Sequence, residues 1–325
     1  MKAIFLNDSA ETIQRVYSAD IRERLGCPGI VSHGELGGGL EDVEVIFSTW
    51  GMPALSEDEI ETYFPALKAV FYAAGSVQRF ARPFLRRGVR VFSAWGANAV
   101  PVAEFTAAQI LLANKGFFQS TAIMKSDGRA GARAYAERFP GNFGAAMGLI
   151  GCGMIGGLVA QMLRACRLEV LAFDPYLSDA RAQTLGVTKC PLEALFSRCQ
   201  TLSNHLADNE QTRGMLHYGL FRRMKPNAVF INTGRGAQVV EADLLRALRE
   251  EPGRTALLDV TDPEPPAPGS ALYTLPNVIL TPHIAGSMGD EVARMGEYMA
   301  DECAAWLHGQ AARYEVTEAM LERMA

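Results

Sequence analysis

The chain has 325 residues, enough for two domains, and its 49% hydrophobic and 21% charged residues are typical of a folded globular protein rather than a disordered one. A formal net charge of −5 excludes a general electrostatic attraction to nucleic acid or to an anionic membrane surface. No segment reaches the roughly 18 uninterrupted apolar residues of a membrane span, and the N-terminal apolar run is too short for a signal peptide. We therefore expect a cytoplasmic protein that binds neither nucleic acid nor membrane.

The cysteines are spread along the chain without a Cys-x-x-Cys pair, and the histidines do not cluster with them. This spacing indicates free thiols in a reducing compartment, and it predicts neither disulfides nor a bound metal. The cysteines are Cys27, Cys152, Cys166, Cys190, Cys199 and Cys303.

Strands and helices alternate over the first hundred residues. Capping residues at Ser56 and Glu59 mark the start of one helix. The alternation predicts a small parallel sheet with helices on both faces. We expect strands at 2–7, 43–49, 67–73 and 89–92, and other helices at 10–25 and 77–87.

A long helical pattern runs from residue 98 to about residue 124, with Pro101 in the first turn, where proline is tolerated. Its length suits a helix that carries the chain into a second domain and packs against a partner subunit. The polar segment 125–142 is expected to be an exposed connection.

Residues 147–174, MGLIGCGMIGGLVAQMLRACRLEVLAFD, have the pattern of a strand, a glycine turn, a helix and a second strand. Gly151 permits a tight turn, Gly153 lets a pyrophosphate approach the backbone, and Gly156 lets the helix pack closely on the strand. The pattern predicts a dinucleotide-binding unit.

The residues around this turn indicate which dinucleotide is bound. The N–H groups of Met154 and Ile155 open a helix whose positive end faces the phosphates. Asp174 follows the second strand, about 20 residues beyond the glycines, where an acid accepts hydrogen bonds from the ribose hydroxyls of NAD and repels the extra phosphate of NADP. The alternative is a glycine-rich turn with a solvated aspartate, but the combined pattern favours NAD.

The alternation resumes after this unit and continues to the end of the chain. The last helix is long enough to return to the first domain. We expect strands at 201–206, 228–232, 256–260 and 278–280, and helices at 180–186, 191–199, 216–224, 241–251 and 288–308.

Three polar residues follow predicted strands, at the sheet edge where parallel α/β proteins bind ligands. They are Arg235 in INTGRG, Glu264 in DVTDPEP and His283 in TPHIAG. Taken one at a time, they can be interpreted without any function, as a solvated arginine, a loop carboxylate and a hydrogen-bonded histidine. Together, they supply a fixed cation, an orienting acid and a proton carrier beside a dinucleotide site.

With these motifs in order after the glycine turn, the chain resembles the NAD-dependent D-isomer-specific 2-hydroxyacid dehydrogenases over nearly its full length. The resemblance implies an α/β protein in which a Rossmann domain, residues 99–288, is inserted into a smaller flavodoxin-like parallel-sheet substrate domain, residues 1–98 and 289–325. It also implies a homodimer.

The family's activity is the reduction of a 2-oxo acid to a D-2-hydroxy acid by NADH. The resemblance implies that His283 protonates the developing oxyanion, that Glu264 orients the imidazole, and that Arg235 grips the substrate carboxylate. Glyoxylate and hydroxypyruvate are the first substrates to expect.

Further positions match the family's cofactor contacts. His205 stands where relatives begin a His-x-Pro stretch, but Ala207 replaces the proline, so a structural and a functional role for His205 both remain open. The residues matching the surroundings of the nicotinamide are Thr106, Thr233, Gly234 and Asp259.

The substrate loop departs from the family pattern. Ala74, Gly75 and Ser76 stand where relatives carry Gly-x-Gly-x-Asp, and they can offer backbone N–H groups to a substrate carboxylate. Trp50 follows another strand, and it either walls the substrate pocket or belongs to the core.

Three alternatives define the limits of this interpretation. Formate dehydrogenases of the same superfamily are expected to carry glutamine at the position of Glu264. A 3-phosphoglycerate dehydrogenase requires extra cations near the substrate loop, where this chain offers Arg79. An NAD-sensing corepressor-like protein retains the triad but binds protein partners, and turnover of a 2-oxo acid separates it from an enzyme.

Overall fold

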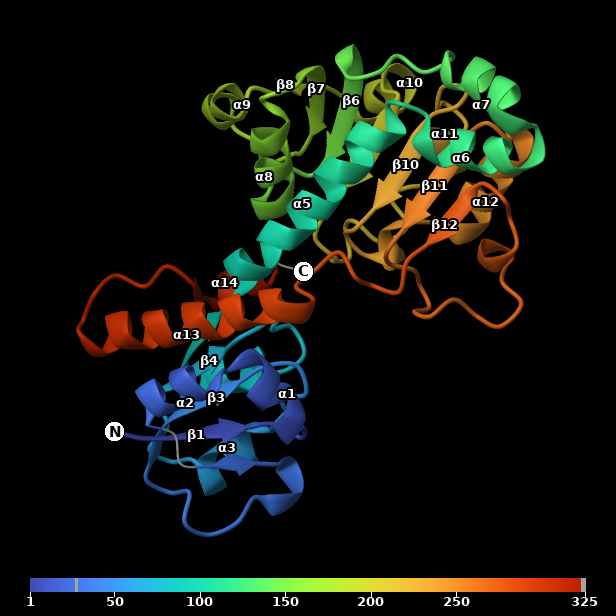
Figure 1. Cartoon of the computed structure of the whole chain (residues 1–325). Coiled ribbons are helices and arrows are strands. Elements are labelled where there is room, and N and C mark those ends of the chain that lie inside the picture. The colour runs from blue at the N-terminus through green and yellow to red at the C-terminus, as the bar shows by residue number, and fades with distance from the viewer. Residues whose placement is uncertain (27–28, 323–325) are drawn as a thin grey trace. The chain divides into compact units, whose positions relative to one another are not determined.

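The computed structural model describes residues 1–26 and 29–322, so Cys27 lies outside the described residues. The chain divides into two compact units (Figure 1). The first contains Met1–Ala99 and Ser287–Ala325, and the second contains Val100–Gly286.

The first unit is built on a six-stranded sheet. Its parallel strands lie in the order β2-β1-β3-β4-β5, which is the flavodoxin-like order, and β13 pairs antiparallel with β5 at the edge. The strands are β1 (Lys2–Leu6), β2 (Ile30–Val31), β3 (Val43–Ser48), β4 (Ala69–Tyr72), β5 (Arg90–Ser93) and β13 (Glu315–Val316).

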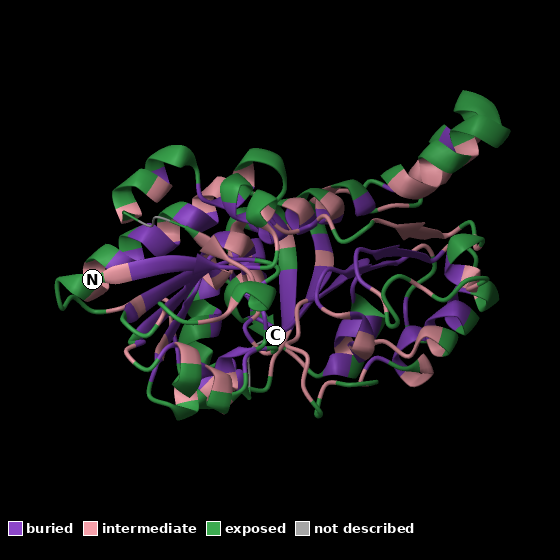
Figure 2. Ribbon diagram, turned by 90° about the horizontal axis from the view of Figure 1, so that it is seen from below, coloured by how far each residue is buried: buried purple, intermediate pink, exposed green. Residues whose placement is uncertain are grey.

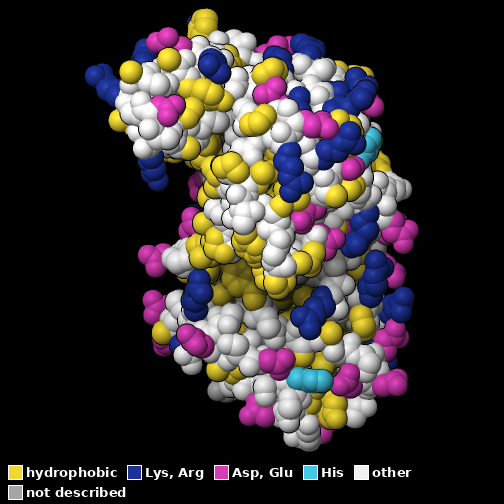
Figure 3. Space-filling view, turned by 90° about the vertical axis from the view of Figure 1, so that its right-hand side faces the viewer, with side chains coloured by type: hydrophobic (Ala, Val, Ile, Leu, Met, Phe, Trp, Pro, Cys, Tyr) yellow, Lys and Arg dark blue, Asp and Glu magenta, His cyan; other side chains and the backbone are white. Residues whose placement is uncertain are grey.

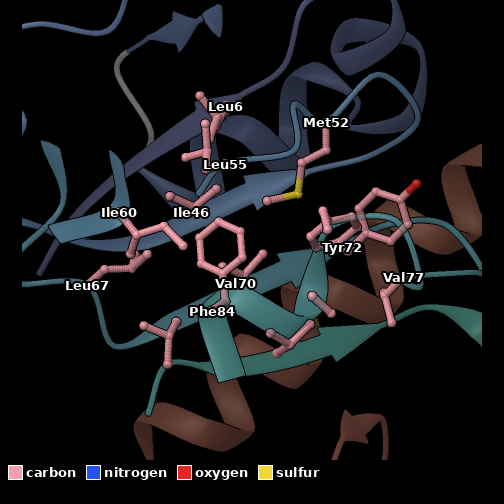
Figure 4. Close-up of a cluster of buried hydrophobic side chains, with 14 of the residues drawn as sticks. Leu6, Ile46, Met52, Leu55, Ile60, Leu67, Val70, Tyr72, Val77 and Phe84 are labelled. Carbon is pink, nitrogen blue, oxygen red and sulfur yellow. The ribbon is translucent and has the colours of Figure 1, made fainter. Parts of the chain in front are cut away.

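Helices cover both faces of this sheet because successive side chains of its strands are apolar on both sides. In β1, Ile4 and Leu6 pack under α3, α4 and α14, whereas Ala3 and Phe5 pack under α1, α2 and α13. Figure 4 shows Leu6 in one cluster with Ile60 of α3 and Phe84 of α4. The helices are α1 (Ala10–Val16), α2 (Ala19–Leu25), α3 (Glu57–Tyr63), α4 (Ala81–Arg86), α13 (Val292–Leu307) and α14 (Glu318–Leu321), with 3₁₀ turns η1 (His33–Glu35) and η4 (Gly289–Glu291).

The second unit has a seven-stranded, fully parallel sheet in the order β8-β7-β6-β9-β10-β11-β12. This is the Rossmann order with one further strand. The predicted fold class, two parallel-sheet α/β units of flavodoxin-like and Rossmann type, is confirmed. The strands are β6 (Phe143–Ile150), β7 (Arg167–Phe173), β8 (Thr188–Lys189), β9 (Thr201–Asn204), β10 (Val229–Asn232), β11 (Thr255–Leu258) and β12 (Val278–Leu280).

Two helical layers bury most of this sheet. Figure 2 shows the buried residues of the chain in purple. α5, α8 and α9 pack on one face, and α10, α11 and α12 pack on the other. The helices are α5 (Trp95–Ala113), α6 (Phe117–Ser126), α7 (Gly128–Ala136), α8 (Met154–Leu163), α9 (Asp179–Leu185), α10 (Leu192–Arg198), α11 (Tyr218–Phe221) and α12 (Glu241–Glu250), with 3₁₀ turns η2 (Gly236–Gln238) and η3 (Ala271–Tyr273).

Two predicted long helices are each divided in the structure. The pattern at 10–25 forms α1 and α2, because the Ser18 side chain caps α2 and Tyr17 turns inward, donating its hydroxyl to the carbonyl of Ser48 over 3.0 Å. The pattern at 98–124 breaks between α5 and α6 at Gly116, whose φ of +66° ends a helix readily.

The segment predicted as an exposed connection, 125–142, contains the helix α7, so that prediction was wrong for this part. Its glycines lower the helix propensity of the sequence. A tertiary contact and a local ion pair compensate: the Tyr135 hydroxyl donates to Oδ1 of Asn227 over 2.6 Å, and Arg133 pairs with Glu137 one turn later.

Several surface features bear on the binding partners. Acidic and basic side chains are interspersed over the face shown in Figure 3. None of the described helices combines the length and apolar character needed to cross a membrane. Within the described ranges there is no group of histidine, cysteine and carboxylate side chains that could hold a metal ion. The described free cysteines are Cys152, Cys166, Cys190, Cys199 and Cys303.

Candidate active site

The glycine turn between β6 and α8 has the steric requirements that its spacing predicts. Gly151 has a φ of +92°, and a Cβ there would lie 2.9 Å from the backbone of His205. A Cβ on Gly156 would lie 2.1 Å from the carbonyl oxygen of Gly151. A Cβ on Gly153 would meet no protein atom within 4 Å. Gly151 and Gly156 are therefore required by the protein's own packing, whereas Gly153 leaves open space where a ligand can approach.

Asp174 lies against this turn. Its Oδ2 accepts the N–H of Cys152 and its Oδ1 accepts the N–H of Tyr176, both over 2.8 Å. These bonds hold the carboxylate at the carboxyl end of β7, beside the open space at Gly153. The first-turn N–H groups of Met154 and Ile155 have no acceptor within α8, as at any helix start. Phosphate-binding donors and a ribose-binding acid are thus both available to a dinucleotide.

His205 packs its backbone against this same turn, at Gly151. Nε2 of its ring lies 2.9 Å from the Ser203 hydroxyl, and Nδ1 has no hydrogen-bond partner among the described residues. Burial lowers the pKa of His205 to about 3, so the imidazole is neutral at ordinary pH. It does not carry a proton in a reaction near neutrality.

A buried amide network joins the ends of β9 and β10. The Asn204 amide donates to Asn232 over 3.0 Å and also to Gln238, and Gln238 donates to the carbonyls of Leu206 and Ala207 over 2.7 and 2.9 Å. The sequence interpretation missed these residues. Amide side chains at the ends of two buried strands were the only available signal.

Asn232 and Gln238 also shape the loop that carries Arg235. The N–H of Gly234 donates to Asn232 over 3.1 Å, and the Asn232 amide donates to the carbonyl of Arg235 over 3.0 Å. The N–H of Arg235 donates to Gln238 over 3.3 Å. Because each amide in the network is engaged by another, the backbone at Gly234 and Arg235 is tightly fixed.

The Arg235 side chain is partly buried. Nη1 donates to the carbonyl of Gly234 over 2.8 Å, and this is its side chain's one hydrogen bond within the described ranges. Desolvation lowers the pKa of Arg235, and the negative charges of Asp208 and Glu264 oppose that shift. The remaining guanidinium donors are available to a bound anion.

His283 and Glu264 form a close pair, with His283 Nδ1 2.6 Å from Glu264 Oε1. Both side chains are exposed, so Nε2 faces solvent or a ligand. Because Glu264 also acts electrostatically on Arg235, the structure brings all three predicted catalytic residues into one region of the second unit.

Asp259 holds the turn in which His283 lies. Its carboxylate accepts the N–H groups of Ile284 and Ala285, each over 2.8 Å, and the Thr281 hydroxyl over 2.6 Å. His283 has a φ of 55°, a left-handed conformation that costs energy in a non-glycine residue. The three bonds to Asp259 therefore stabilise the turn that carries His283. The predicted contact of Asp259 with a nicotinamide remains a prediction.

Thr106 of α5 and Thr233 after β10 are both buried, and their hydroxyl oxygens lie 3.1 Å apart. A Cβ on Gly234 would lie 3.0 Å from the Asn204 amide nitrogen. Gly234 is thus needed for close packing at this position. The pairing fixes α5 to the end of β10, next to the Arg235 loop, and the predicted cofactor contacts of these residues stay predictions.

The loop after β4 belongs to the first unit. The Ala74 N–H donates to the carbonyl of Tyr72 over 2.9 Å, and the predicted contact of Ala74 with a substrate remains a prediction. The Ser93 hydroxyl lies 2.9 and 2.5 Å from the carbonyl oxygens of Ala74 and Gly75, which holds this loop at the end of β5. The N–H groups of Gly75 and Ser76 remain candidates for binding a substrate carboxylate.

Trp50 follows β3 in the same unit, and its side chain is 40% exposed. The alternative in which Trp50 belongs to the core is therefore wrong. The backbone carbonyl of Trp50 accepts the Asn7 amide over 3.0 Å, which holds this loop at the end of β3.

Residues 107–285 match the family described as D-isomer specific 2-hydroxyacid dehydrogenase, NAD binding domain. The chain belongs to the D-isomer specific 2-hydroxyacid dehydrogenase family. The matched domain is the family's NAD-binding domain, so NAD is its cofactor. The predictions of the family and of the cofactor are confirmed.

Among curated members of this dehydrogenase family, two similar proteins are D-3-phosphoglycerate dehydrogenases. That of Archaeoglobus fulgidus is 31% identical over 239 residues, which are 73% of this chain and 44% of the relative. That of Mycobacterium tuberculosis is 33% identical over 226 residues, which are 69% of this chain and 42% of the relative. The chain therefore spans less than half the length of these relatives.

A solved structure of a D-isomer specific 2-hydroxyacid dehydrogenase, from Lactobacillus delbrueckii ssp. bulgaricus in an NAD-complexed form, is 18% identical and superposes with a TM-score of 0.77. The match covers 98% of this chain and 100% of that chain. At this identity the likeness concerns the fold alone.

Proposed function

We propose that this chain reduces a small 2-oxo acid to the D-2-hydroxy acid with NADH. The observation that carries the proposal is the 2.6 Å bond between His283 and Glu264, with the partly buried cation of Arg235 in the same unit, which matches the NAD-binding domain. A proton carrier, an orienting acid and a fixed cation are the groups that this reduction requires.

His283 acts as the proton donor. Its Nδ1 is engaged by Glu264, so Nε2 is the ring atom that meets the substrate oxygen. Reduction places negative charge on that oxygen, and the imidazolium neutralises it by donating a proton. Glu264 fixes the orientation of the ring and stabilises its protonated form. In the reverse direction, the neutral ring accepts the hydroxyl proton.

Arg235 binds the substrate carboxylate. Its guanidinium makes one hydrogen bond to the protein, to Gly234, so a planar pair of N–H donors is left for a planar acid. Burial strengthens this ion pair because little water competes for the guanidinium. The fixed backbone at residue 235 then sets the orientation of the 2-oxo group.

The residues around the glycine turn fit NAD. The open space at Gly153 and the first-turn N–H groups of α8 would hold the pyrophosphate, and Asp174 would hold the adenosine ribose. When bound, NADH supplies the hydride. Neutral His205 would pack beside the cofactor, without taking part in proton transfer.

The first unit carries predicted anion-binding groups of its own. The N–H groups of Gly75 and Ser76 are placed at the carboxyl end of β4, where they can receive an anionic group. Trp50, exposed at the end of β3, would define which side chains the pocket admits. Glyoxylate and hydroxypyruvate are the first substrates to test.

A second candidate substrate is the 2-oxo acid that corresponds to 3-phosphoglycerate. The names of the two curated relatives favour it. Arg79, an exposed cation shortly after Ser76, is available for a phosphate group. This reaction uses the same triad and differs in the substrate loop alone.

Oxidation of NADH against a panel of 2-oxo acids tests the proposal. We expect turnover of glyoxylate or hydroxypyruvate, and no more than slow turnover of phenylpyruvate. Preferred turnover of 3-phosphohydroxypyruvate, lost in Arg79→Gln, would establish the second candidate instead. Tight NADH binding with no turnover of any acid would contradict both enzyme proposals and support an NAD-sensing, corepressor-like protein.

We further propose that the protein is a homodimer formed through α6. Phe117 and Met124 of this helix are 45% and 50% exposed, and such apolar side chains are suited to a subunit interface. Light scattering should give twice the chain mass, and Phe117→Ser with Met124→Ser should give a monomer. Tyr273→Ser, at an exposed site elsewhere, is the matched control, and a monomeric wild type would contradict the proposal.

A cytoplasmic location is also part of the proposal. It is supported by the free state of the described cysteines, three of which, Cys152, Cys199 and Cys303, are buried with their thiol pKa raised to about 12. Such thiols are inert and suit a reducing compartment. Fractionation of cells that produce the protein tests this location.

A further inference from the structure

Arg181 lies in the first turn of α9, and its side chain reaches the glycine turn. Its backbone N–H donates to the Ser178 hydroxyl over 3.2 Å. Its Nη2 lies 3.2 Å from the position that a Cβ on Gly157 would take, and the same position is 3.8 Å from the carbonyl oxygen of Cys152. The guanidinium therefore lies against the first turn of α8, close to the segment that connects β6 to α8.

Asp174 lies against the same segment, through its bond from the N–H of Cys152. Burial is the main cause that raises the pKa of the Cys152 thiol. The negative charge of Asp174 raises this pKa further, and the positive charge of Arg181 lowers it, so both charges act on the thiol. An anion-repelling carboxylate and an anion-attracting guanidinium thus lie beside one short stretch of backbone. The pyrophosphate is proposed to bind at this stretch, with the adenosine ribose beside it at Asp174.

The guanidinium of Arg181 is exposed, and its side chain makes no hydrogen bond or ion pair with any part of the chain that the structure describes. By contrast, Arg198 in the same unit pairs with Glu169 over 2.7 Å. All of the hydrogen-bond donors of Arg181 are therefore available to a ligand. Gly157, which has no side chain, leaves the room that this close approach needs.

We propose that Arg181 is a second cofactor-specificity residue, positioned to receive a phosphate on the ribose 2′-oxygen, so that discrimination between NADH and NADPH depends on the balance between Asp174 and Arg181. The proposal rests on the ribose-binding role proposed for Asp174, and it does not depend on which acid is reduced. Asp174 disfavours the dianionic 2′-phosphate, and Arg181 partly offsets that effect. Removing Asp174 alone should therefore yield a site that binds NADPH well.

Equilibrium binding of NADH and NADPH, measured by nicotinamide fluorescence at low ionic strength, tests this without any turnover. Arg181→Gln should weaken NADPH binding about tenfold, since hydrogen bonds between charged groups contribute about 1.5–3 kcal/mol, and should change NADH binding by less than about twofold. Arg181→Lys should restore most of the NADPH affinity. Arg249→Gln removes an exposed arginine of α12 and is the matched control.

The double variant separates this role from a general effect of charge. Asp174→Ser should tighten NADPH binding, and adding Arg181→Gln should abolish that gain. Equal weakening of NADH and NADPH by Arg181→Gln, or no change in either, would overturn the proposal. Because binding is measured directly, a failure of this inference is distinguishable from an inactive enzyme, in which NADH still binds and no acid is turned over.

Discussion

Replacing Gly153 by alanine should separate cofactor binding from folding. A Cβ at this position would meet no protein atom within 4 Å, and the φ of Gly153, −65°, is one that any residue adopts. We therefore expect the free energy of unfolding to change by no more than about 0.5 kcal/mol. The added methyl group occupies the space where the pyrophosphate approaches the backbone.

The expected loss is in NADH affinity. Displacing the pyrophosphate from one N–H donor of the turn removes a hydrogen bond to a charged group, which contributes about 1.5–3 kcal/mol, so the Kd for NADH should rise about ten- to a hundredfold. Fluorescence titration measures the Kd, and urea unfolding measures the stability.

Gly156→Ala is the matched comparison. Its Cβ would lie 2.1 Å from the carbonyl oxygen of Gly151, so the backbone must shift and stability should fall by about 1–3 kcal/mol. An unchanged NADH Kd in Gly153→Ala, with its stability also unchanged, would refute the assignment of this space to the pyrophosphate.

Three further predictions follow from the site. The pKa of His205 falls from 6.5 to about 3 on folding, so below pH 6.5 the unfolded chain takes up a proton that the folded chain does not. Through this group, the free energy of unfolding should be about 2 kcal/mol lower at pH 5 than near pH 7.5. Urea unfolding of His205→Asn should show that this pH-dependent loss of stability is gone. Arg235→Lys keeps the charge but loses the planar pair of donors, so steady-state kinetics should show KM for the 2-oxo acid raised at least about tenfold, with NADH binding unchanged; an unaltered KM would remove Arg235 from substrate binding. Asp259→Asn directs an amide nitrogen at a backbone N–H, so thermal unfolding should reveal a loss of about 1–3 kcal/mol, and a neutral effect would contradict its role in holding the turn.

Those parts of the site that depend on local sequence could be predicted from it. The glycine spacing specifies its own turn, because Gly151 and Gly156 are each required by contacts within a few residues or with the adjoining strand end. Arg235, Glu264 and His283 could be recognised because parallel strands bring their carboxyl ends to one edge of a sheet.

Features that depend on contacts distant in the sequence could not be predicted. The amide network of Asn204, Asn232 and Gln238 forms only when two strands and a 3₁₀ turn meet, and none of its members belongs to a motif. The N–H of Ala74 is taken by a carbonyl two residues earlier, which depends on the exact path of the loop. Arg181 reaches the glycine turn only because α9 packs against α8.

The most direct test of the central claim is single-turnover reduction of the preferred 2-oxo acid by His283→Asn, with NADH binding measured on the same sample. Asparagine tolerates the left-handed backbone at this position, with its φ of 55°, but cannot transfer the proton. We predict a fall in the rate of hydride transfer of about a hundredfold or more, while the Kd for NADH stays within about threefold of the wild-type value. A rate close to that of the wild type, with NADH bound normally, would contradict the assignment of His283 as the proton donor.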